Sequence, residues 1–204
     1  MLQDIPTPIQ SAERPRARFV IETERLMLRR PTRADVPAIA RLANDRRIAE
    51  MTRRLPHPYL TEHATEFVDA LAAQTTHGGD AVYLIEHLHS PVGIVGIDWR
   101  DAASPELGYW LGCAHWGRGF ATEAARAVID VAFDDHAIEH IVSGARVANP
   151  ASRNILEKCG FQWVGVELHR FEALRSSTPV DRFRLSRNVW SSLKNWSAAT
   201  RHEE

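Results

Sequence analysis

Three apolar runs joined by short connections constrain the fold more than any other feature of this 204-residue chain. The runs span residues 81–87, 92–99 and 106–111, and the segments His89–Pro91 and Asp101–Pro105 separate them. Each run has the length of a β-strand. Connections this short join antiparallel neighbours, because a parallel pair needs a crossover of a dozen or more residues. The chain is therefore expected to contain an antiparallel three-stranded meander.

Helical patterns precede the meander. A short strand is predicted over residues 25–29, and Thr32 with Asp35 then has the spacing of a helix capping box. Apolar residues at helical spacing follow directly. A second helix is expected over residues 61–74, ended by the segment 77–80.

Strands and helices alternate after the meander. The pattern predicts a helix opened by residues 116–123, a strand over 138–147, a short helix over 152–158, a strand over 161–168, a loop over 169–181 and a last strand over 182–187. This order indicates an α+β fold, that is, a mixed layer with one central sheet.

Length and composition fit one ordinary globular domain. A chain of 204 residues with 44% apolar and 25% charged residues is typical of that class. We expect residues 1–18 to form a flexible leader, residues 19–190 the domain, and residues 191–204 a polar tail.

Charge and cysteine content exclude several classes of protein. A net charge of −1 speaks against an extended nucleic-acid-binding surface. No stretch approaches the ~20 apolar residues of a membrane helix, and residues 1–18 do not read as a secretory signal. Cys113 and Cys159 form no CxxC pair, and Cys159 reads as a core residue. A cytoplasmic location without disulfides is expected.

The segment 111–122, LGCAHWGRGFAT, runs from a strand through a glycine-bearing turn into a helix. Glycines let the backbone approach a ligand, and the first N–H groups of a helix are unpaired, so the arrangement suits a phosphate or pyrophosphate. Taken alone, it fits equally well a helix start whose glycines serve only tight packing. A Rossmann fingerprint fits less well, since the third glycine is missing, and a P-loop is excluded because no Gly-Lys-Ser/Thr follows.

A second segment, residues 149–161 (NPASRNILEKCGF), reads as a short helix. Asn149 or Ser152 would cap it, Lys158 lies in its last turn, and Gly160 ends it. Taken alone, Asn-x-x-Ser indicates capping rather than chemistry.

The strand Glu106–Leu111, the segment 111–122 and the segment 149–161 occur in an order that resembles the GNAT acetyltransferase superfamily. The similarity is greatest to the branch typified by the RimJ/RimL ribosomal-protein N-terminal acetyltransferases. The opening ERLMLR and the closing stretch from Asp181 to Trp190 also match, so the resemblance covers roughly residues 20–190. It implies a mostly antiparallel twisted sheet, flanked by helices, in which two splayed strands hold acetyl-CoA.

The resemblance also implies which residues bind the acetyl-CoA co-substrate. The splayed strands are those over residues 106–111 and 138–147, and Asn149 hydrogen-bonds the cofactor arm. The remaining implied cofactor-binding residues are Tyr109, Trp110, Leu111, Trp116, Gly117, Arg118, Gly119, Phe120, Ala121, Thr122 and Lys158. One position departs from the family pattern, because Ala114 stands where Gln or Arg usually begins the phosphate motif.

In this family an amine attacks the thioester directly. The resemblance implies Glu106 as general base, directly or through water, and Ser152 as acid or hydrogen-bond donor to the sulfur, with Asn149 beside it. An α-amine with a pKa of about 7.7–8.0 is partly neutral near neutrality, whereas a lysine at about 10.4 is almost fully charged, so a carboxylate base suits an α-amine better. Two alternatives stay open: Glu106 holds the charged amine or pairs with an arginine, and Ser152 only caps its helix.

The acceptor is expected to be a protein N-terminus or a small-molecule amine. In the family it lies between the segment over residues 46–60 and the loop over 169–181. The first segment carries four arginines, which suit an acceptor with carboxylate or phosphate groups unless they form only a solvated basic loop: Arg46, Arg47, Arg53 and Arg54. Homodimers are common in this branch.

Other candidate chemistry is weaker. Cys113 lies beside the glycine turn, but no His-Asp arrangement is evident to activate it. His87 with His89, and His136 with His140, lack the carboxylate or cysteine partners of a metal site, so no metal is expected. The alternatives to an acetyltransferase are a catalytically silent CoA-binding regulatory module and a nucleotide-binding enzyme of another kind.

Overall fold

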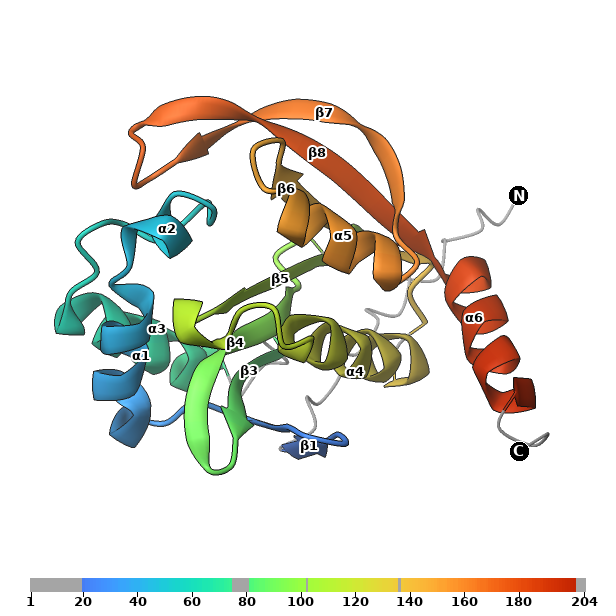
Figure 1. The fold of residues 1–204 in the computed structure, drawn as a ribbon, viewed down its shortest axis with the longest axis horizontal. Coiled ribbons are helices and arrows are strands. Elements are labelled where there is room, and N and C mark those ends of the chain that lie inside the picture. Colours follow the sequence, from blue (N-terminus) through green and yellow to red (C-terminus); the bar gives the residue numbers. More distant parts are fainter. Residues whose placement is uncertain (1–19, 75–80, 102, 136, 201–204) are drawn as a thin grey trace, which may run out of the picture.

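The computed structural model describes residues 20–74, 81–101, 103–135 and 137–200 (Figure 1). The predicted leader, residues 1–18, and the segment 77–80 lie outside these residues. Within the described ranges the strands are β1 (Val20–Glu22), β2 (Met27–Arg29), β3 (Ala81–His87), β4 (Ser90–Asp98), β5 (Glu106–Leu111), β6 (His140–Arg146), β7 (Gln162–Phe171) and β8 (Ser176–Ser186). The helices are α1 (Val36–Ala43), α2 (Arg46–Ala49), α3 (Thr61–Gln74), α4 (Phe120–Asp135), α5 (Pro150–Lys158) and α6 (Arg187–Thr200), with 3-10 turns η1 (Arg33–Asp35) and η2 (Cys113–His115).

The strands form one sheet in the order β1-β2-β3-β4-β5-β6-β8-β7. Strands β3, β4 and β5 are the predicted antiparallel meander. The pair β5–β6 is parallel, and the other neighbours are antiparallel. The expectation of a mostly antiparallel sheet flanked by helices is confirmed.

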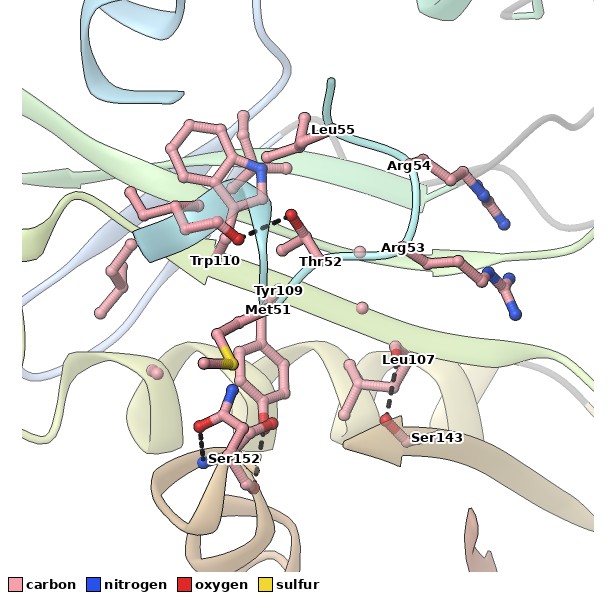
Figure 2. A pocket seen from close by; sticks show the side chains of 18 of the residues that line it. Met51, Thr52, Arg53, Arg54, Leu55, Leu107, Tyr109, Trp110, Ser143 and Ser152 are labelled. Carbon is pink, nitrogen blue, oxygen red and sulfur yellow. Dashed lines mark hydrogen bonds between the residues drawn. The ribbon is translucent and has the colours of Figure 1, made fainter. Parts of the chain in front are cut away.

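The parallel pair β5–β6 separates almost as soon as it forms. Only Glu106 with Val142 and Leu107 with Ser143 are paired in register. The Ser143 hydroxyl donates to the Leu107 carbonyl oxygen at 2.9 Å, which satisfies the last carbonyl of the pair (Figure 2). Beyond this point β5 continues from residue 108 to 111 with β4 on one side and no strand pairing on the other. We call this opening the β5–β6 wedge.

Apolar side chains pack on both faces of the sheet. A large cluster joins the sheet to α4, whose buried residues include Phe120, Val128 and Phe133. A smaller cluster lies under α1 and α3 and includes Ile39 and Val68. Strand β5 contributes to both: Leu107, Tyr109 and Leu111 pack in the α4 cluster, and Trp110 packs against the other.

The capping box at Thr32 and Asp35 is present and starts η1 and α1. Its carboxylate also belongs to a buried ionic cluster. Arg29 donates to both oxygens of Asp35, at 2.8 and 2.7 Å, and to Glu86 at 2.6 Å. Asp35 and Glu86 are each only 6% exposed. This cluster ties β2, β3 and η1 together.

Two expectations were wrong. Residues 169–181 are not a loop, because β7 runs on to Phe171 and β8 already begins at Ser176, leaving a turn over 172–175. Register pairing with β7 and β6 instead makes this stretch a strand, and strand formation depends on such neighbours more than on composition.

The stretch predicted as a polar tail from residue 191 is helical to residue 200, as part of α6. Trp190 stacks on Phe133 with ring centroids 4.9 Å apart, and its indole N–H donates to Asp130 at 2.6 Å. These contacts with α4 anchor the helix. Within the described residues, no helix is both long enough and apolar enough to cross a membrane.

Candidate active site

A cavity of about 1270 Å³ opens at the β5–β6 wedge. Most of the predicted site residues line it, drawn from β5, from the glycine turn and the start of α4, and from α5 with its cap. They are Glu106, Tyr109, Trp110, Leu111, Trp116, Gly117, Gly119, Phe120, Ala121, Thr122, Asn149, Ser152 and Lys158. The predicted residue that does not line it is Arg118, whose guanidinium lies over the Phe120 ring at 4.6 Å from its centroid.

The glycine turn opens the cavity onto the start of α4. Gly117 and Gly119 have φ angles of +72° and +79°, a left-handed conformation that favours glycine. Helix α4 begins immediately afterwards at Phe120, so its first N–H groups have no partners within the helix. Backbone of this kind, at the positive end of a helix dipole, can bind an anion.

A charged contact not predicted from the sequence supports this turn. Arg25 donates to Glu123 in the first turn of α4 at 2.7 Å and to the Arg118 carbonyl oxygen at 3.0 Å. Thr23 adds a hydrogen bond to the same carboxylate at 2.6 Å. Sequence reasoning missed Arg25 because its partners lie more than 90 residues away.

The start of α5 brings together two predicted residues and one new hydrogen bond. Asn149 Oδ1 accepts from the Ser152 backbone N–H at 3.1 Å, so Asn149 is the helix cap. The Tyr109 hydroxyl lies 2.9 Å from the Ser152 hydroxyl and 3.1 Å from the Ser152 carbonyl oxygen (Figure 2). Burial raises the pKa of Tyr109 above its ordinary value, so the phenol stays protonated.

A tyrosine hydroxyl has one proton to donate. When Tyr109 donates to the Ser152 carbonyl oxygen, the Ser152 hydroxyl donates to Tyr109. When Tyr109 donates to the Ser152 hydroxyl instead, the serine proton is available to the cavity. In that arrangement the pair presents the serine O–H to the cavity as a hydrogen-bond donor.

Glu106 lies between two arginines. Arg182 donates to one carboxylate oxygen at 2.8 Å, and Arg53 donates to the other at 2.9 Å. Burial would raise the pKa of this carboxyl, but the hydrogen bond from Arg182 and the charges of both arginines outweigh it and hold the pKa below its usual value. Arg182 reaches Glu106 across Gly144, where a Cβ would lie 2.9 Å from the guanidinium. Glu106 is thus ionised, and the arginine pairing left open by the sequence is present.

The basic segment before α3 is divided. Arg46 is exposed, lies outside the cavity lining and pairs with Glu50. Arg47 lines the cavity and pairs with Asp45. Arg53 and Arg54 line the cavity, where Arg54 pairs with Asp98. In Figure 2 the labelled segment from Met51 to Leu55 runs alongside β5.

The β7–β8 hairpin faces this segment, as expected for the acceptor side. The Glu172 N–H donates to the Arg53 carbonyl oxygen at 3.1 Å, which joins the turn of the hairpin to the segment before α3. His169, Phe171, Val180 and Arg182 line the cavity from the hairpin. The paired strands therefore supply the wall that the sequence assigned to a loop.

The remaining candidates contribute no nucleophile. Burial first, and the neighbouring Asp45 second, raise the pKa of the Cys113 thiol to about 11, so the thiolate is disfavoured. Cys159 is buried in the core. The described residues contain no group of three or more His, Cys, Asp or Glu side chains placed to hold a metal ion. His136 lies outside those residues.

Comparison with known proteins identifies the family. The family described as "Acetyltransferase (GNAT) domain" matches residues 25–162. The chain is 31% identical over 182 residues to YoaA of Bacillus subtilis, an uncharacterized N-acetyltransferase, covering 86% of this chain and 97% of YoaA. It is 42% identical over 60 residues to YjcK of Bacillus subtilis, a probable N-acetyltransferase, covering 29% of this chain and 33% of YjcK.

The structure is similar to that of RimL, a ribosomal L7/L12 α-N-protein acetyltransferase solved in complex with coenzyme A. The TM-score is 0.73 at 19% identity, with 82% of this chain and 97% of the RimL chain covered. At that identity the similarity shows the fold, while the match to YoaA and the domain match show the family. The chain belongs to the GNAT family of acyl-CoA-dependent N-acetyltransferases.

Proposed function

We propose that the protein transfers the acetyl group of acetyl-CoA to the α-amine of a protein N-terminus or to a small-molecule amine. The observation that carries this proposal is the continuity of the cavity. One space joins the start of α4, the β5–β6 wedge and the carboxylate of Glu106. The anion site at α4 suits the cofactor phosphates, and the unpaired edge of β5 suits the pantetheine. The carboxylate of Glu106 at the far end suits the amine.

The cofactor has a defined place in this proposal. Its pyrophosphate binds the backbone N–H groups of residues 116–122, and Arg118 and Lys158 meet CoA phosphates at the rim. Its pantetheine pairs with β5 at residues 109–111, where β6 has moved away. Asn149 uses its side-chain oxygen to cap α5, which leaves its amide N–H group to bind the cofactor arm. RimL, which shares this fold, was solved in complex with coenzyme A, and this supports a CoA cofactor.

The amine attacks the thioester carbonyl directly. Glu106 accepts the amine proton, directly or through water. Because its pKa is held low, Glu106 is a weak base, and an acceptor already partly neutral suits it better than a lysine. The departing thiolate receives a proton or hydrogen bond from Ser152, with Tyr109 behind it.

The Tyr109–Ser152 pair predicts non-additive losses. Ser152→Ala and Tyr109→Phe are each expected to lower kcat about tenfold, at the low end of acid–base effects because the thiolate is a good leaving group. If the two form one proton path, the double variant loses no more than either single variant. Steady-state kinetics on the three variants test this. A Ser152→Ala enzyme that melts normally and keeps full activity would refute the acid role.

A thermal melt with acetyl-CoA, CoA, NAD and ATP side by side tests the proposed function. A ligand at about 100 times its Kd adds about 2.7 kcal/mol, which raises the Tm by several degrees. Stabilisation by the two CoA species alone is expected. Stabilisation by NAD or ATP instead contradicts the proposal. Binding of acetyl-CoA with no acetyl transfer to any amine identifies a silent CoA-binding module.

We propose further that the protein is a cytoplasmic homodimer. Both cysteines are free thiols, as is usual in a reducing compartment. Strand β7 lies at the edge of the sheet and exposes several large apolar side chains: Trp163, Val164, Val166 and Leu168. An exposed apolar edge of this kind is a ready interface. Sedimentation tests the state, and a monomer at micromolar concentration contradicts the proposal.

A further inference from the structure

Arg146 is a half-buried cation in the cavity wall. Its Nη1 donates to the Glu50 carbonyl oxygen at 2.7 Å and lies 3.9 Å from the Met51 sulfur. Its guanidinium lies over the Phe171 ring, 5.6 Å from the centroid. In the part of the chain that the structure describes, no carboxylate forms an ion pair with Arg146 within 4.0 Å. Holding a charge against apolar surface without a counter-charge is costly, so such a residue indicates an anion supplied from outside the chain.

The surrounding wall also carries excess positive charge. Arg53 and Arg182 share one carboxylate, Glu106. Glu167 lies 3.4 Å from Arg182, but its side chain is 60% exposed and it does not line the cavity. Among the described residues, the arginines that line the cavity outnumber the carboxylates: Arg47, Arg53, Arg54, Arg100, Arg146 and Arg182 against Glu66, Asp98 and Glu106. Glu106 is already occupied by two arginines, so the charge of Arg146 stays unbalanced.

The strand register sets the distance between the amine site and this anion site. Gly144 pairs with Arg182, which crosses it to reach Glu106. Arg146 lies two residues farther along β6 on the same face, because side chains alternate along a strand. Two residues of a strand span about 7 Å. Glu106 itself is in register with Val142, four residues from Arg146, so an acceptor that reaches both residues carries its oxyanion several bonds from its nitrogen, farther than in a free α-amino acid.

A backbone hydrogen bond joins two elements of the cavity wall on the acceptor side. The hydrogen bond from the Glu172 N–H to the Arg53 carbonyl oxygen joins the turn of the β7–β8 hairpin to the segment before α3. Arg146 itself donates a hydrogen bond to the Glu50 carbonyl oxygen at the end of α2. Figure 1 shows α2 beside the free end of the hairpin. A wall closed in this way favours a small acceptor over an extended polypeptide.

We propose that Arg146 binds an oxyanion of the acceptor, and that the acceptor is a small α-amine whose carboxylate or phosphate lies several bonds from the nitrogen, as in a dipeptide. This inference rests on the proposed function, because it names the acceptor class of the same site. Arg146 is a specificity-determining residue in this proposal, and it takes no part in the chemical step.

Three acceptors with the same amine test the proposal: glycylserine, its C-terminal amide, and that amide with a phosphate on the serine. The amide is the uncharged control, and the other two separate a carboxylate from a phosphate. The wild type is expected to show kcat/KM at least about tenfold higher for one or both anionic acceptors, as a charge-assisted hydrogen bond allows. In Arg146→Gln the preference should fall to within about twofold, mainly through KM, while Arg146→Lys keeps part of it.

Arg170→Gln is the matched control, because Arg170 is exposed on β7 outside the cavity lining, and it should keep the wild-type preference. The CoA-induced rise in Tm of Arg146→Gln shows whether this variant still binds the cofactor. Equal acetylation of all three acceptors, or an undiminished preference in Arg146→Gln, overturns the inference and leaves the proposed function standing. No transfer to any of the three also overturns it, and the CoA melt with a wider amine panel then decides the proposed function separately.

Discussion

Glu106→Gln is expected to lower kcat/KM by about 100-fold near pH 6.5 and by much less near pH 9. In the wild type Arg182 and Arg53 hold the pKa of Glu106 low, so the carboxylate is ionised throughout this range. The wild-type rate should therefore follow the amine alone, rising with pH up to an amine pKa of about 8 and levelling above it. A base matters most where the amine is mainly protonated. The loss in Glu106→Gln should shrink as pH rises.

A pH–rate profile of both enzymes makes the measurement. A loss of the same size at every pH would show that Glu106 only positions the amine or the two arginines. Glu157→Gln is the control, since it removes a carboxylate outside the cavity lining, one that pairs with Arg153 on α5 at side-chain exposures of 50% and 46%. The Tm of both variants in the presence of CoA shows that neither effect comes from misfolding.

Arg29→Met is expected to destabilise the protein by about 3–5 kcal/mol, the cost of leaving a buried ion pair with one partner. Arg29 is the shared partner of Asp35 and Glu86, whose side chains are each only 8% exposed. For a protein of this size that loss lowers the Tm by about 10 °C. The hydrogen bond from Arg29 is the main cause that lowers the pKa of Asp35.

The pH dependence of this loss has a definite sign. A carboxylate with a lowered pKa contributes stability above its unfolded pKa of about 3.9 and loses that contribution as pH falls through its folded value. In Arg29→Met the Asp35 carboxylate loses the guanidinium that held its pKa low, so it takes up a proton more readily. The deficit in unfolding free energy should therefore be largest near neutrality and shrink towards about pH 4.

Denaturant unfolding near neutrality and near about pH 4 measures the loss of unfolding free energy in Arg29→Met. Arg33→Met is the matched control, because Arg33 pairs with Asp69 at the surface with side-chain exposures of 79% and 40%. Its loss should be much smaller than that of Arg29→Met, because an exposed ion pair contributes little to stability. Equal losses in the two variants would show that burial of the Arg29 cluster does not matter. Neutralising both carboxylates in the Arg29→Met background should restore part of the stability.

Local patterns in the sequence predicted the parts of this fold that local forces decide. The short turns led to the β3–β4–β5 meander, and Thr32 with Asp35 led to the helix start. The glycine turn predicted where α4 begins. Each of these rests on residues close together in the chain, so one stretch of sequence is sufficient to see it.

Long-range contacts decided what the sequence did not predict. Glu106 was chosen as a site residue, but its partners lie 53 and 76 residues away, and no pattern in one chain links them. Arg146 belongs to no recognisable sequence motif, and only the fold brings it into contact with the end of α2 and with Phe171. The same holds for the 169–181 stretch, whose strand character comes from β6 and β7 on either side.

The β5–β6 wedge has a consequence for how this protein can diverge. On the proposed binding mode the pantetheine pairs with main-chain groups of residues 109–111, and every amino acid but proline carries both the donor and the acceptor. Substitutions there leave cofactor recognition largely unchanged. The acceptor side is built from side chains such as Arg53 and Arg146, so single substitutions alter it directly. Descendants of this chain can therefore exchange one amine for another while they inherit the same cofactor.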